Sequence, residues 1–408
     1  MPAVDPIALA AFSGNVLIAR GMSAADAATV AASLDYADRR GVPSHGVSFL
    51  PMYLKMIADG DLDPRAVPRL ERDAPGPIII DAQRAAGAVA MKFALGIGLA
   101  QVRETGVANL WIRGMTHAGA MGCYADEAAR AGCIVSIAIA GTPFMAYHGA
   151  ASASATTGPL ALAVPGPGGE PIVLDMATSG ISFARLKAAR AAGKPLPPGV
   201  AADAQGTPTV DPSAARVPLP IGGPKGAGLA LMFELMASLA VGNPIIADHL
   251  SPASARRHTQ NAMLTLARVD AFRSLESFTH DVAALRDALK SQPRAAGVEE
   301  ILLPGERRAR AAAQSREVAI PEPLWRELVA IAEHGLVPTN QAARMTYAAD
   351  PGVLQAAVAA GILADWHTEV EHFRKVMPQD YRRVLEAQQR AAEQGIDPVD
   401  AMMEAAHG

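Results

Sequence analysis

Met115-Thr116-His117-Ala118-Gly119-Ala120-Met121-Gly122 lies between a predicted strand and a predicted helix. An apolar run over 107–113 precedes it and an alanine-rich helical pattern over 124–131 follows it, so the order is strand, glycine turn, helix. In such units ligands sit beyond the carboxyl ends of strands, where loop side chains point into an open crevice. A histidine there can exchange a proton near neutral pH, because its free pKa is about 6.5. His117 is therefore either a proton-transfer residue or an incidental histidine in a helix-capping loop.

Length and composition indicate a soluble protein with a large core. The chain has 408 residues, of which 50% are hydrophobic, enough for two domains or for one large domain with appendages. Unbroken apolar runs are shorter than the roughly 18 residues of a membrane span, and the N-terminus lacks the basic segment of a secretory signal. The formal charge of -4 gives no reason to expect nucleic-acid binding. We therefore expect a cytoplasmic protein that binds neither membranes nor nucleic acids.

The two cysteines support the same expectation. Cys123 and Cys133 lie at opposite ends of a predicted helix, which makes a bridge between them improbable. Unbridged thiols suit a reducing cytoplasm, and two cysteines at this spacing supply no metal site. The sequence predicts no metal centre.

Hydrophobic periodicity and turn signals divide the rest of the chain into helices and strands. Ser23 is the expected N-cap of the second helix. The segment 187–215, rich in alanine, proline and glycine, is expected to be a long surface excursion. Helices are predicted over about 5–20, 23–39, 85–105, 229–241, 276–291 and 322–333, and further strands over 77–81, 134–140, 159–165, 172–174 and 263–269.

Three further loops carry residues that suit a binding site. Ser44-His45-Gly46 follows the second helix and is either a simple turn or part of a site that needs a second polar loop. Asp175 follows a buried strand and is either a cap or a ligand contact. The glycine-rich turn 222–228 opens a helix, where backbone N–H groups and Lys225 suit a phosphate or carboxylate. No GxGxxG fingerprint occurs, so an ordinary Rossmann domain is not expected.

In order and spacing, these segments resemble the malate/L-lactate dehydrogenase family of NAD(P)-dependent oxidoreductases. The family also includes ureidoglycolate and sulfolactate dehydrogenases and cyclic ketimine reductases, and the resemblance covers residues 1 to about 335. Its motifs are Arg40-Gly41-Val42-Pro43-Ser44-His45-Gly46-Val47, His117-Ala118-Gly119-Ala120-Met121-Gly122, Leu174-Asp175-Met176-Ala177-Thr178-Ser179, Gly222-Gly223 with Lys225-Gly226, and Pro304-Gly305-Glu306.

The resemblance implies an α/β fold whose cofactor-binding sheet is mostly antiparallel instead of a Rossmann unit. The N-terminal region would be helical and the protein a homodimer. Residues 1–115 with 236–339 would form a helical domain for substrate binding and dimerisation, and 116–235 the NAD(P)-binding domain. Residues 340–408 would be a helical C-terminal extension.

The resemblance also implies a reaction and its residues. The reaction is hydride transfer between NAD or NADP and a small 2-oxo acid, 2-hydroxy acid or cyclic imino acid. His117 would transfer the proton, with His45 and Asp175 as further catalytic residues. Ser44, His45 and Phe49 would line the substrate pocket. The implied cofactor contacts are Thr142, Asp175, Met176, Ala177, Lys225, Pro304, Gly305 and Glu306.

The chain departs from the family pattern at five positions. Phe49 stands where arginine is usual, and that arginine is expected to hold the substrate carboxylate through a directional, charge-assisted fork. Two alternatives follow. Either the substrate is more apolar near Phe49, or catalysis is weakened or lost and the protein is a partner-binding scaffold. The other departures are Thr116 and Gly158 in place of asparagine, and Pro224 and Ala227 in place of histidine and tyrosine.

The C-terminal tail resembles the extreme C-terminus of the glutamate synthase large subunit. The matching runs are 362–366 (Ile-Leu-Ala-Asp-Trp), 373–385 and the final residues 403–408. This resemblance implies docking onto a flavoprotein partner such as a glutamate synthase small subunit. An inert helix left by gene fusion is the alternative.

Overall fold

A computed structural model describes residues 2–72, 76–251 and 258–332. These residues belong to one compact unit, Met1–Val337. The tail and its predicted runs at 362–366, 373–385 and 403–408 lie outside the described residues.

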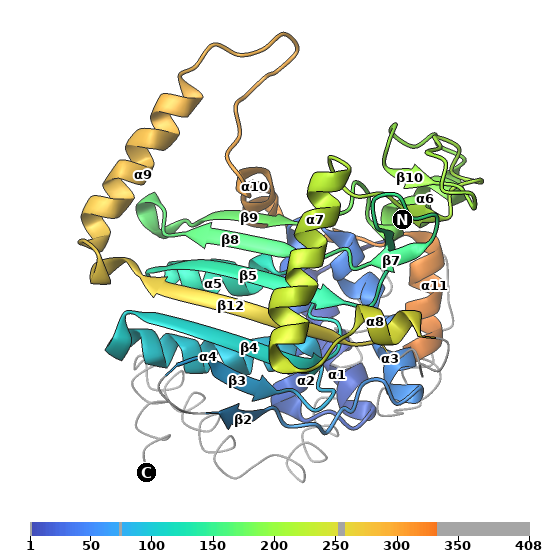
Figure 1. Cartoon of the computed structure of the whole chain (residues 1–408), viewed down its shortest axis with the longest axis horizontal. Coiled ribbons are helices and arrows are strands. Elements are labelled where there is room, and N and C mark those ends of the chain that lie inside the picture. The colour runs from blue at the N-terminus through green and yellow to red at the C-terminus, as the bar shows by residue number, and fades with distance from the viewer. Residues whose placement is uncertain (1, 73–75, 252–257, 333–408) are drawn as a thin grey trace, which may run out of the picture. The chain divides into compact units, whose positions relative to one another are not determined.

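A seven-stranded sheet forms the centre of the unit (Figure 1). Its strand order is β2-β3-β4-β12-β5-β8-β9, and every neighbouring pair is antiparallel except the parallel pair β3 and β4. The predicted α/β fold with a mostly antiparallel sheet is thereby confirmed. The strands are β2 (Arg69–Arg72), β3 (Ile78–Asp81), β4 (Val107–Met115), β5 (Cys133–Gly141), β8 (Leu160–Val164), β9 (Ile172–Met176) and β12 (Gln260–Arg268).

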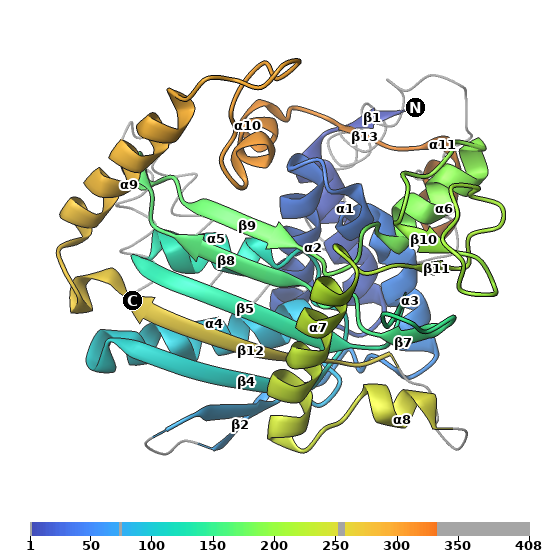
Figure 2. The same cartoon turned by 45° about the horizontal axis from the view of Figure 1, so that its top comes forward.

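Helices cover both faces of this sheet (Figure 2). On one face lie α4 (Gly87–Thr105) and α5 (Gly122–Arg130), with α1 (Pro6–Ala19) and α2 (Ala24–Arg39) beyond them. On the other face α7 (Pro224–Phe233) continues as a π-helix, η4 (Glu234–Ser238), and a 3-10 turn, η5 (Leu239–Val241). The core lies between the sheet and α4 and α5, because alternate apolar residues of the strands point that way. Leu110, Ile112, Ile137 and Leu264 are fully buried there.

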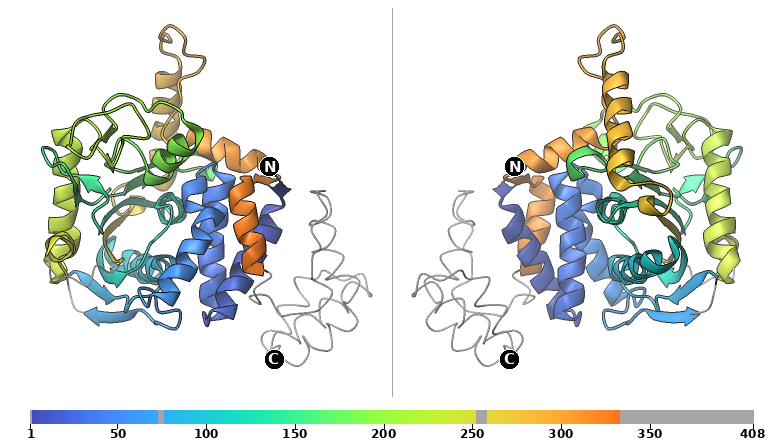
Figure 3. Two further views of the ribbon diagram at one scale, coloured as in Figure 1. Left: turned by 90° about the vertical axis from the view of Figure 1, so that its right-hand side faces the viewer. Right: turned by 90° about the vertical axis from the view of Figure 1, so that its left-hand side faces the viewer.

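The ends of the described chain meet at the helical side of the unit. The short strand β1 (Ala3–Val4) pairs with β13 (Val318–Ala319), and α11 (Glu322–Ile331) lies beside α1 and α2 (Figure 3). Trp325 and Leu328 of α11 are buried. The remaining elements are α3 (Leu50–Ala58), β6 (Met145–Ala146), β7 (Ala153–Ala155), α6 (Phe183–Ala192), β10 (Ala201–Ala202), β11 (Val217–Pro218), α8 (Ile246–Leu250), α9 (Leu275–Lys290), α10 (Glu306–Gln314) and the 3-10 turns η1 (Pro43–His45), η2 (Val47–Phe49), η3 (Pro167–Gly169) and η6 (Val269–Ala271).

The sequence predicted, to within a few residues, all strands of the central sheet except β2 and the helices α1, α2, α4, α5, α7, α9 and α11. It did not predict α3, α6, α8, α10 or the short strands outside the central sheet. Ser23 caps α2 as predicted, since its side chain accepts a hydrogen bond from the Asp26 N–H. The surface excursion predicted for 187–215 is wrong in part, because α6 and the pair β10 and β11 enclose a small core of their own. That core holds only a few buried side chains, among them Leu186 and Leu196. Its apolar residues are too sparse to give a periodic signal.

One helical run, Pro224–Val241, is long and apolar enough to cross a membrane by length and composition alone. Lys225 and Glu234 interrupt it, so the prediction that no unbroken apolar run reaches about 18 residues is unaffected. The run contacts β4, β5 and β12 on one side. A core helix of a soluble protein passes the same test.

Strand direction brings several loops to one edge of the sheet. β4, β5 and β9 all end at this edge, while β8 and β12 begin there, as the pairs Gln260 with Met115, Gln260 with Gly141 and Leu160 with Met176 show. The sheet therefore joins strands from both predicted domains. The boundary between 1–115 with 236–339 and 116–235 stays a prediction.

Candidate functional site

His117 lies at this edge, directly after β4, in a ring of aromatic side chains. The Phe49 ring stacks on the imidazole, with centroids 3.8 Å apart and planes inclined by 17°. His45 is stacked at 5.4 Å, and the rings of Tyr53 and His258 lie at 6.0 and 6.3 Å. The second polar loop that the Ser44-His45-Gly46 turn required is thus the His117 loop.

Helix α4 and strand β12 pack against the backbone of the His117 loop. Gly87, the first residue of α4, lies so close that a Cβ there would be 2.5 Å from Ala118 Cα and 2.6 Å from the His117 carbonyl carbon. The Ala118 N–H donates to Gln260 Oε1 at 3.0 Å. Helix α4 and strand β12 therefore hold the loop rigidly, as a proton-transfer residue requires.

Hydrogen bonds to the His117 ring assign its neutral tautomer. The Gly119 N–H donates to Nδ1 at 3.3 Å, so in the neutral ring Nδ1 is the acceptor and Nε2 carries the hydrogen. The Tyr53 hydroxyl lies 3.3 Å from Nδ1 and donates to the His117 carbonyl oxygen at 3.2 Å. Its oxygen can therefore accept a hydrogen from Nδ1 when the ring is charged. Both protonation states of His117 have partners.

Three imidazoles share the site, and all three are held toward the neutral form. Burial lowers the pKa of His117 well below 6.5, and the neighbouring His45 and His258 lower it further. Burial also lowers the pKa of His45 and of His258, although Asp175 and Asp61 respectively act in the opposite direction. Cations are disfavoured here because a charged ring loses its hydration.

Asp38 positions the Ser44-His45-Gly46 turn. Its carboxylate accepts the Val47 N–H at 2.8 Å, and Gly46 approaches it so closely that a Cβ there would lie 1.8 Å from Asp38 Oδ1. Burial raises the pKa of Asp38 to about 7, with the Val47 hydrogen bond opposing that rise. The Ser44 hydroxyl lies 2.9 Å from His45 Nδ1. The turn therefore presents an oriented Ser-His pair toward His117.

The departures from the family pattern have structural consequences. Thr116 is buried, and its hydroxyl donates to the Ala85 carbonyl at 3.1 Å. A side chain at Gly158 would begin 3.0 Å from Phe233 of α7, and Ala227 of the same helix is buried. Pro224 is the first residue of α7, a position where proline lacks only an N–H that has no helical partner. The absence of a side chain at Gly158 thus allows α7 to pack closely against the residues before β8.

Asp175 lies at the end of β9 and makes structural contacts. Its carboxylate accepts the N–H of Gly122, the first residue of α5, at 2.9 Å. Arg308 donates to the Asp175 carbonyl oxygen at 3.1 Å and approaches its carboxylate at 3.8 Å. The carboxylate thus caps α5, the helix after the His117 loop, and not the segment that follows Asp175. It still acts on the site, because it raises the pKa of His45 against burial.

The other implied cofactor contacts surround the same end of β9. Thr142 follows β5, and its N–H donates to the Thr259 carbonyl, next to His258. Lys225 is exposed at the start of α7, where the Ile221 N–H donates to the Thr178 carbonyl. Met176 and Ala177 are half-buried between these segments along the chain.

The Pro304-Gly305-Glu306 loop reaches β9 from the other side. Gly305 packs against it, since a Cβ would lie 2.5 Å from the Val173 carbonyl oxygen. Glu306 is held within the loop by the Leu303 N–H at 3.0 Å and Lys290 at 2.6 Å. This carboxylate therefore shapes the start of α10.

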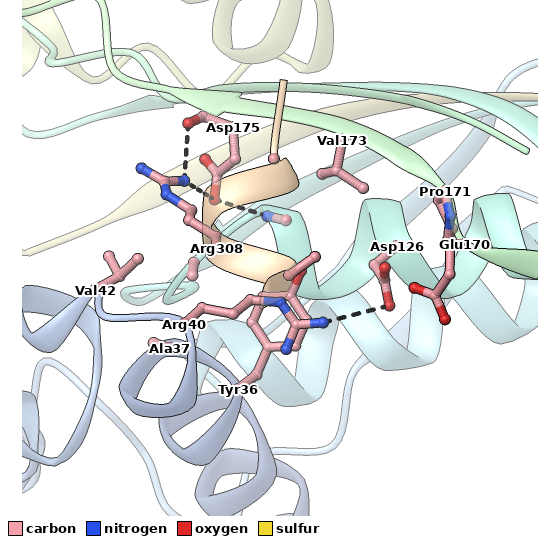
Figure 4. A pocket seen from close by; sticks show the side chains of 14 residues that line it. Tyr36, Ala37, Arg40, Val42, Asp126, Glu170, Pro171, Val173, Asp175 and Arg308 are labelled. Carbon is pink, nitrogen blue, oxygen red and sulfur yellow. Dashed lines mark hydrogen bonds and ion pairs between the residues drawn. The ribbon is translucent and has the colours of Figure 1, made fainter. Parts of the chain in front are cut away.

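A pocket bounded by α2, α5, β9 and α10 adjoins Asp175 (Figure 4). Asp175 and Arg308 are paired on one side of it, and Arg40 approaches Asp126 at 3.9 Å on another. Arg40 also lies over the Tyr36 ring at 3.5 Å. Guanidinium groups, a tyrosine ring and carboxylates are the groups that bind phosphates, bases and ribose hydroxyls in dinucleotide sites. The pocket encloses only about 30 Å³, the scale of a water molecule, so these groups can border a dinucleotide and cannot enclose one.

Sequence patterns gave no role to three residues of this site. Tyr53 lies one helical turn beyond Phe49 on α3, a spacing that places both on one face and could have revealed it. Asp38 looked like an ordinary residue in the last turn of α2. His258 precedes β12, and only the pairing of β12 with β4 and β5 brings it to His117.

Comparisons with known proteins agree with this geometry. The sequence model of the family described as malate/L-lactate dehydrogenase matches residues 4–329. Ureidoglycolate dehydrogenase (NAD(+)) of Escherichia coli strain K12 is 32% identical over 295 residues, which are 72% of this chain and 84% of that protein. Delta(1)-pyrroline-2-carboxylate reductase of Ancylobacter novellus is 30% identical over 334 residues, 79% of this chain and 95% of that protein.

A solved structure of a related dehydrogenase has a similar fold. Sulfolactate dehydrogenase from Methanocaldococcus jannaschii has a TM-score of 0.75 and 28% identity, covering 82% of this chain and 98% of that one. The matched residues 4–329 end before the tail. The glutamate synthase resemblance therefore receives no support from these proteins.

Proposed function

The chain belongs to the malate/L-lactate dehydrogenase family, and on that premise we propose that it transfers hydride between a nicotinamide dinucleotide and a small 2-oxo or 2-hydroxy acid or a cyclic imino acid. The relatives carry the substrate classes in their names: ureidoglycolate, pyrroline-2-carboxylate and sulfolactate. The observation that carries the proposal is the convergence of His117 with His45, an oriented pair with Ser44, at one edge of the sheet.

The protein's part in the reaction is to hold the substrate and manage one proton. The cofactor, NAD or NADP, supplies or accepts the hydride. His117 presents Nε2 toward the oxygen or nitrogen of the substrate, while Tyr53 and Gly119 hold Nδ1. General acid–base catalysis of this kind accelerates a reaction by roughly 10²- to 10⁴-fold.

The cofactor contacts are proposed to border β9. Asp175 and Met176 end β9, Ala177 follows it and Thr142 follows β5, while Lys225 and the 304–306 loop would supply the charged groups of the site. The side chains that line the small pocket beside Asp175 and Arg308 would border the dinucleotide. Titrations with NADH and with NADPH, followed by the quenching of tryptophan fluorescence, distinguish the two cofactors.

The His117→Ala variant tests the proposed chemistry. It should bind NADH or NADPH as tightly as the natural chain and lose at least a hundredfold in kcat, because the proton donor is gone. Turnover measured with a panel of 2-oxo acids and cyclic imines decides this. Full activity in the variant would assign the proton transfer elsewhere, with His45 as the next candidate.

Two further expectations accompany this proposal. We propose a homodimer, which sedimentation would report as twice the chain mass of 42.2 kDa. We also propose a cytoplasmic location, because Cys123 and Cys133 are both free thiols. The scaffold alternative, acting through a tail that docks on a flavoprotein, has no observation in its favour.

A further inference from the structure

A row of aromatic rings leads from His117 to the protein surface. The centroid distances along it are 3.8 Å from Phe49 to His117, 6.3 Å to His258, 6.2 Å on to Phe144 and 6.4 Å to Phe183. We call these five residues the aromatic strip. Its members come from five separate segments, namely the start of α3, the loop after β4, the residues before β12, the loop after β5 and the start of α6.

The strip passes from a shielded interior end to an open outer end. Phe49 and His117 are half-buried, whereas Phe144 is 42% and Phe183 is 56% exposed. Only nine phenylalanines occur in the whole chain, and three of them lie on the strip. Phe144 and Phe183 thus extend the row of rings that begins at His117 into solvent. A ligand that covered these exposed rings would bury apolar surface, which is favourable.

The strip offers ring faces and little charge. His117 has ring contacts within the described residues to His45, Phe49, Tyr53 and His258, and the charged or titratable groups acting on it are the two histidines. Arg308, whose charge contributes to the lowered pKa of the neighbouring His45, is engaged by Asp175. Within residues 2–72, 76–251 and 258–332, no cation lies over a ring of the strip, so an acidic substituent there would lose its hydration without an opposite charge from these residues. A flat apolar group would stack on Phe144 and Phe183.

His258 adds one polar group inside the strip. Its Nε2 is buried and has no hydrogen-bond partner among the residues that the structure describes. Its backbone N–H donates to Asp61 at 3.2 Å, and its ring lies between those of His117 and Phe144. A neutral imidazole in this position can give or accept one hydrogen bond, such as one to a polar atom between the reacting carbon and an apolar group.

We propose that the aromatic strip binds the non-reacting part of the substrate, and that the substrate is a 2-oxo acid or cyclic imino acid with a flat apolar or aromatic substituent in place of a second acidic group. The proposal rests on the proposed function for the placement of the reacting carbon beside His117. Phe144 and Phe183 are then specificity-determining residues. Phe49 forms the inner wall of the same surface.

The competing occupant of the strip is the cofactor, because the predicted cofactor contact Thr142 lies two residues before Phe144. The experiment therefore measures substrate-side and cofactor-side binding separately. Calorimetric titration of the full chain saturated with NADH or NADPH gives the Kd of 3-phenyllactate, lactate and malate, none of which can react with the reduced cofactor. The variants are Phe144→Ala and Phe183→Ala. The control is Phe272→Ala, a ring 67% exposed beyond the far end of β12.

The expected order of affinity is 3-phenyllactate first, then lactate, then malate. Each strip variant should reduce the ratio of the phenyllactate and lactate affinities by roughly threefold, the effect of one aromatic pair, while Phe272→Ala leaves it unchanged. Tightest binding of malate, an unchanged ratio in both variants, or weaker binding of the dinucleotide alone would each overturn the proposal.

Turnover separates this proposal from the one it rests on. Phenylpyruvate should exceed pyruvate in kcat/KM, and the strip variants should narrow that difference. If no 2-oxo acid or cyclic imine is reduced at all, the proposed function fails. The calorimetric affinity ratios still test the role of the aromatic strip, and they are measured without cofactor if neither NADH nor NADPH binds.

Discussion

Nδ1 of His117 determines how easily this imidazole gains a proton. The Gly119 N–H points at Nδ1 from 3.3 Å and therefore disfavours a hydrogen on Nδ1. The Tyr53 oxygen, also 3.3 Å from Nδ1, can accept such a hydrogen and therefore favours it. Tyr53 in turn donates to the His117 carbonyl, which leaves its oxygen free to accept. The tyrosine is thus a positioning residue for the charged state of the histidine.

The pH dependence of the two reaction directions follows from this arrangement. The pKa of His117 lies well below 6.5, so the ring is neutral at pH 7. Reduction consumes a proton, and its kcat/KM should rise as the pH falls toward that pKa. Oxidation needs the neutral ring in the tautomer that carries its hydrogen on Nδ1, facing the Tyr53 oxygen, because only this tautomer leaves Nε2 free to accept the substrate proton. Its rate should stay constant from neutral pH upward. Initial rates over a pH series in both directions check this, and the opposite slopes would contradict it.

The Tyr53→Phe variant should shift the pH dependence of reduction to lower pH. Without the hydroxyl, the charged ring loses an acceptor for its Nδ1 hydrogen and the pKa of His117 falls further. Reduction should then slow by about tenfold above the pKa, and oxidation should slow as well, because the neutral tautomer that leaves Nε2 free loses the same acceptor. The imidazole proton resonances in NMR titrations report the pKa directly. An unchanged pKa would remove Tyr53 from this role.

Variants of Asp38 test whether the position of the Ser44-His45-Gly46 turn affects the rate, because Asp38 holds this turn without being one of the proposed reacting groups. Asp38→Ala removes the acceptor for the Val47 N–H, so the Ser44-His45 turn should loosen and kcat should fall by about tenfold. Asp38→Asn keeps a side-chain oxygen and should restore most of the rate. The thermal midpoint of both variants provides the control for folding. Equal loss in both variants would show that the charge, and not the hydrogen bond, matters.

The helices and strands that carry the site residues explain which parts of the site could be predicted from the sequence. His117, Ser44-His45 and Asp175 each follow an element with a clear period, so their loops were predictable. Thr142 contacts Thr259, the residue after His258, only because β12 lies between β4 and β5, a pairing between segments far apart in the chain. The role of Asp175 as the α5 cap was missed for the same reason, since Gly122 is its neighbour only in space.

The approach of α4 to the His117 loop gives a matched pair of variants. Gly87→Ala places a Cβ 2.5 Å from backbone atoms of Ala118, so α4 or the loop must shift. We expect a lower thermal midpoint and a lower kcat/KM. Gly96→Ala, on the same helix with nothing within 4 Å of the new Cβ, should stabilise the protein by about 1 kcal/mol. Thermal unfolding and steady-state rates of the two variants, compared directly, decide whether the close contact matters.

For the molecule as a whole, the family match and the compact unit coincide. Residues 4–329 match the family, and the described chain reaches residue 332. All implied catalytic and cofactor residues lie within these limits. A chain ending at residue 339 should therefore keep its kcat/KM and cofactor Kd, measured beside the full chain. Loss of activity in the shortened chain, with its circular dichroism retained, would give the tail a part in function.

The place of β12 in the sheet also shapes how the chain must fold. β4 and β5 are consecutive in sequence but do not pair, and the strand that joins them ends only at Arg268. During synthesis, both therefore present unpaired edges until more than a hundred further residues have emerged. Closure of the sheet depends on contacts of long sequence separation, which slows folding. The histidine site is completed by the same event, because β12 carries His258 to His117, so refolding rate and recovery of activity should share one slow phase.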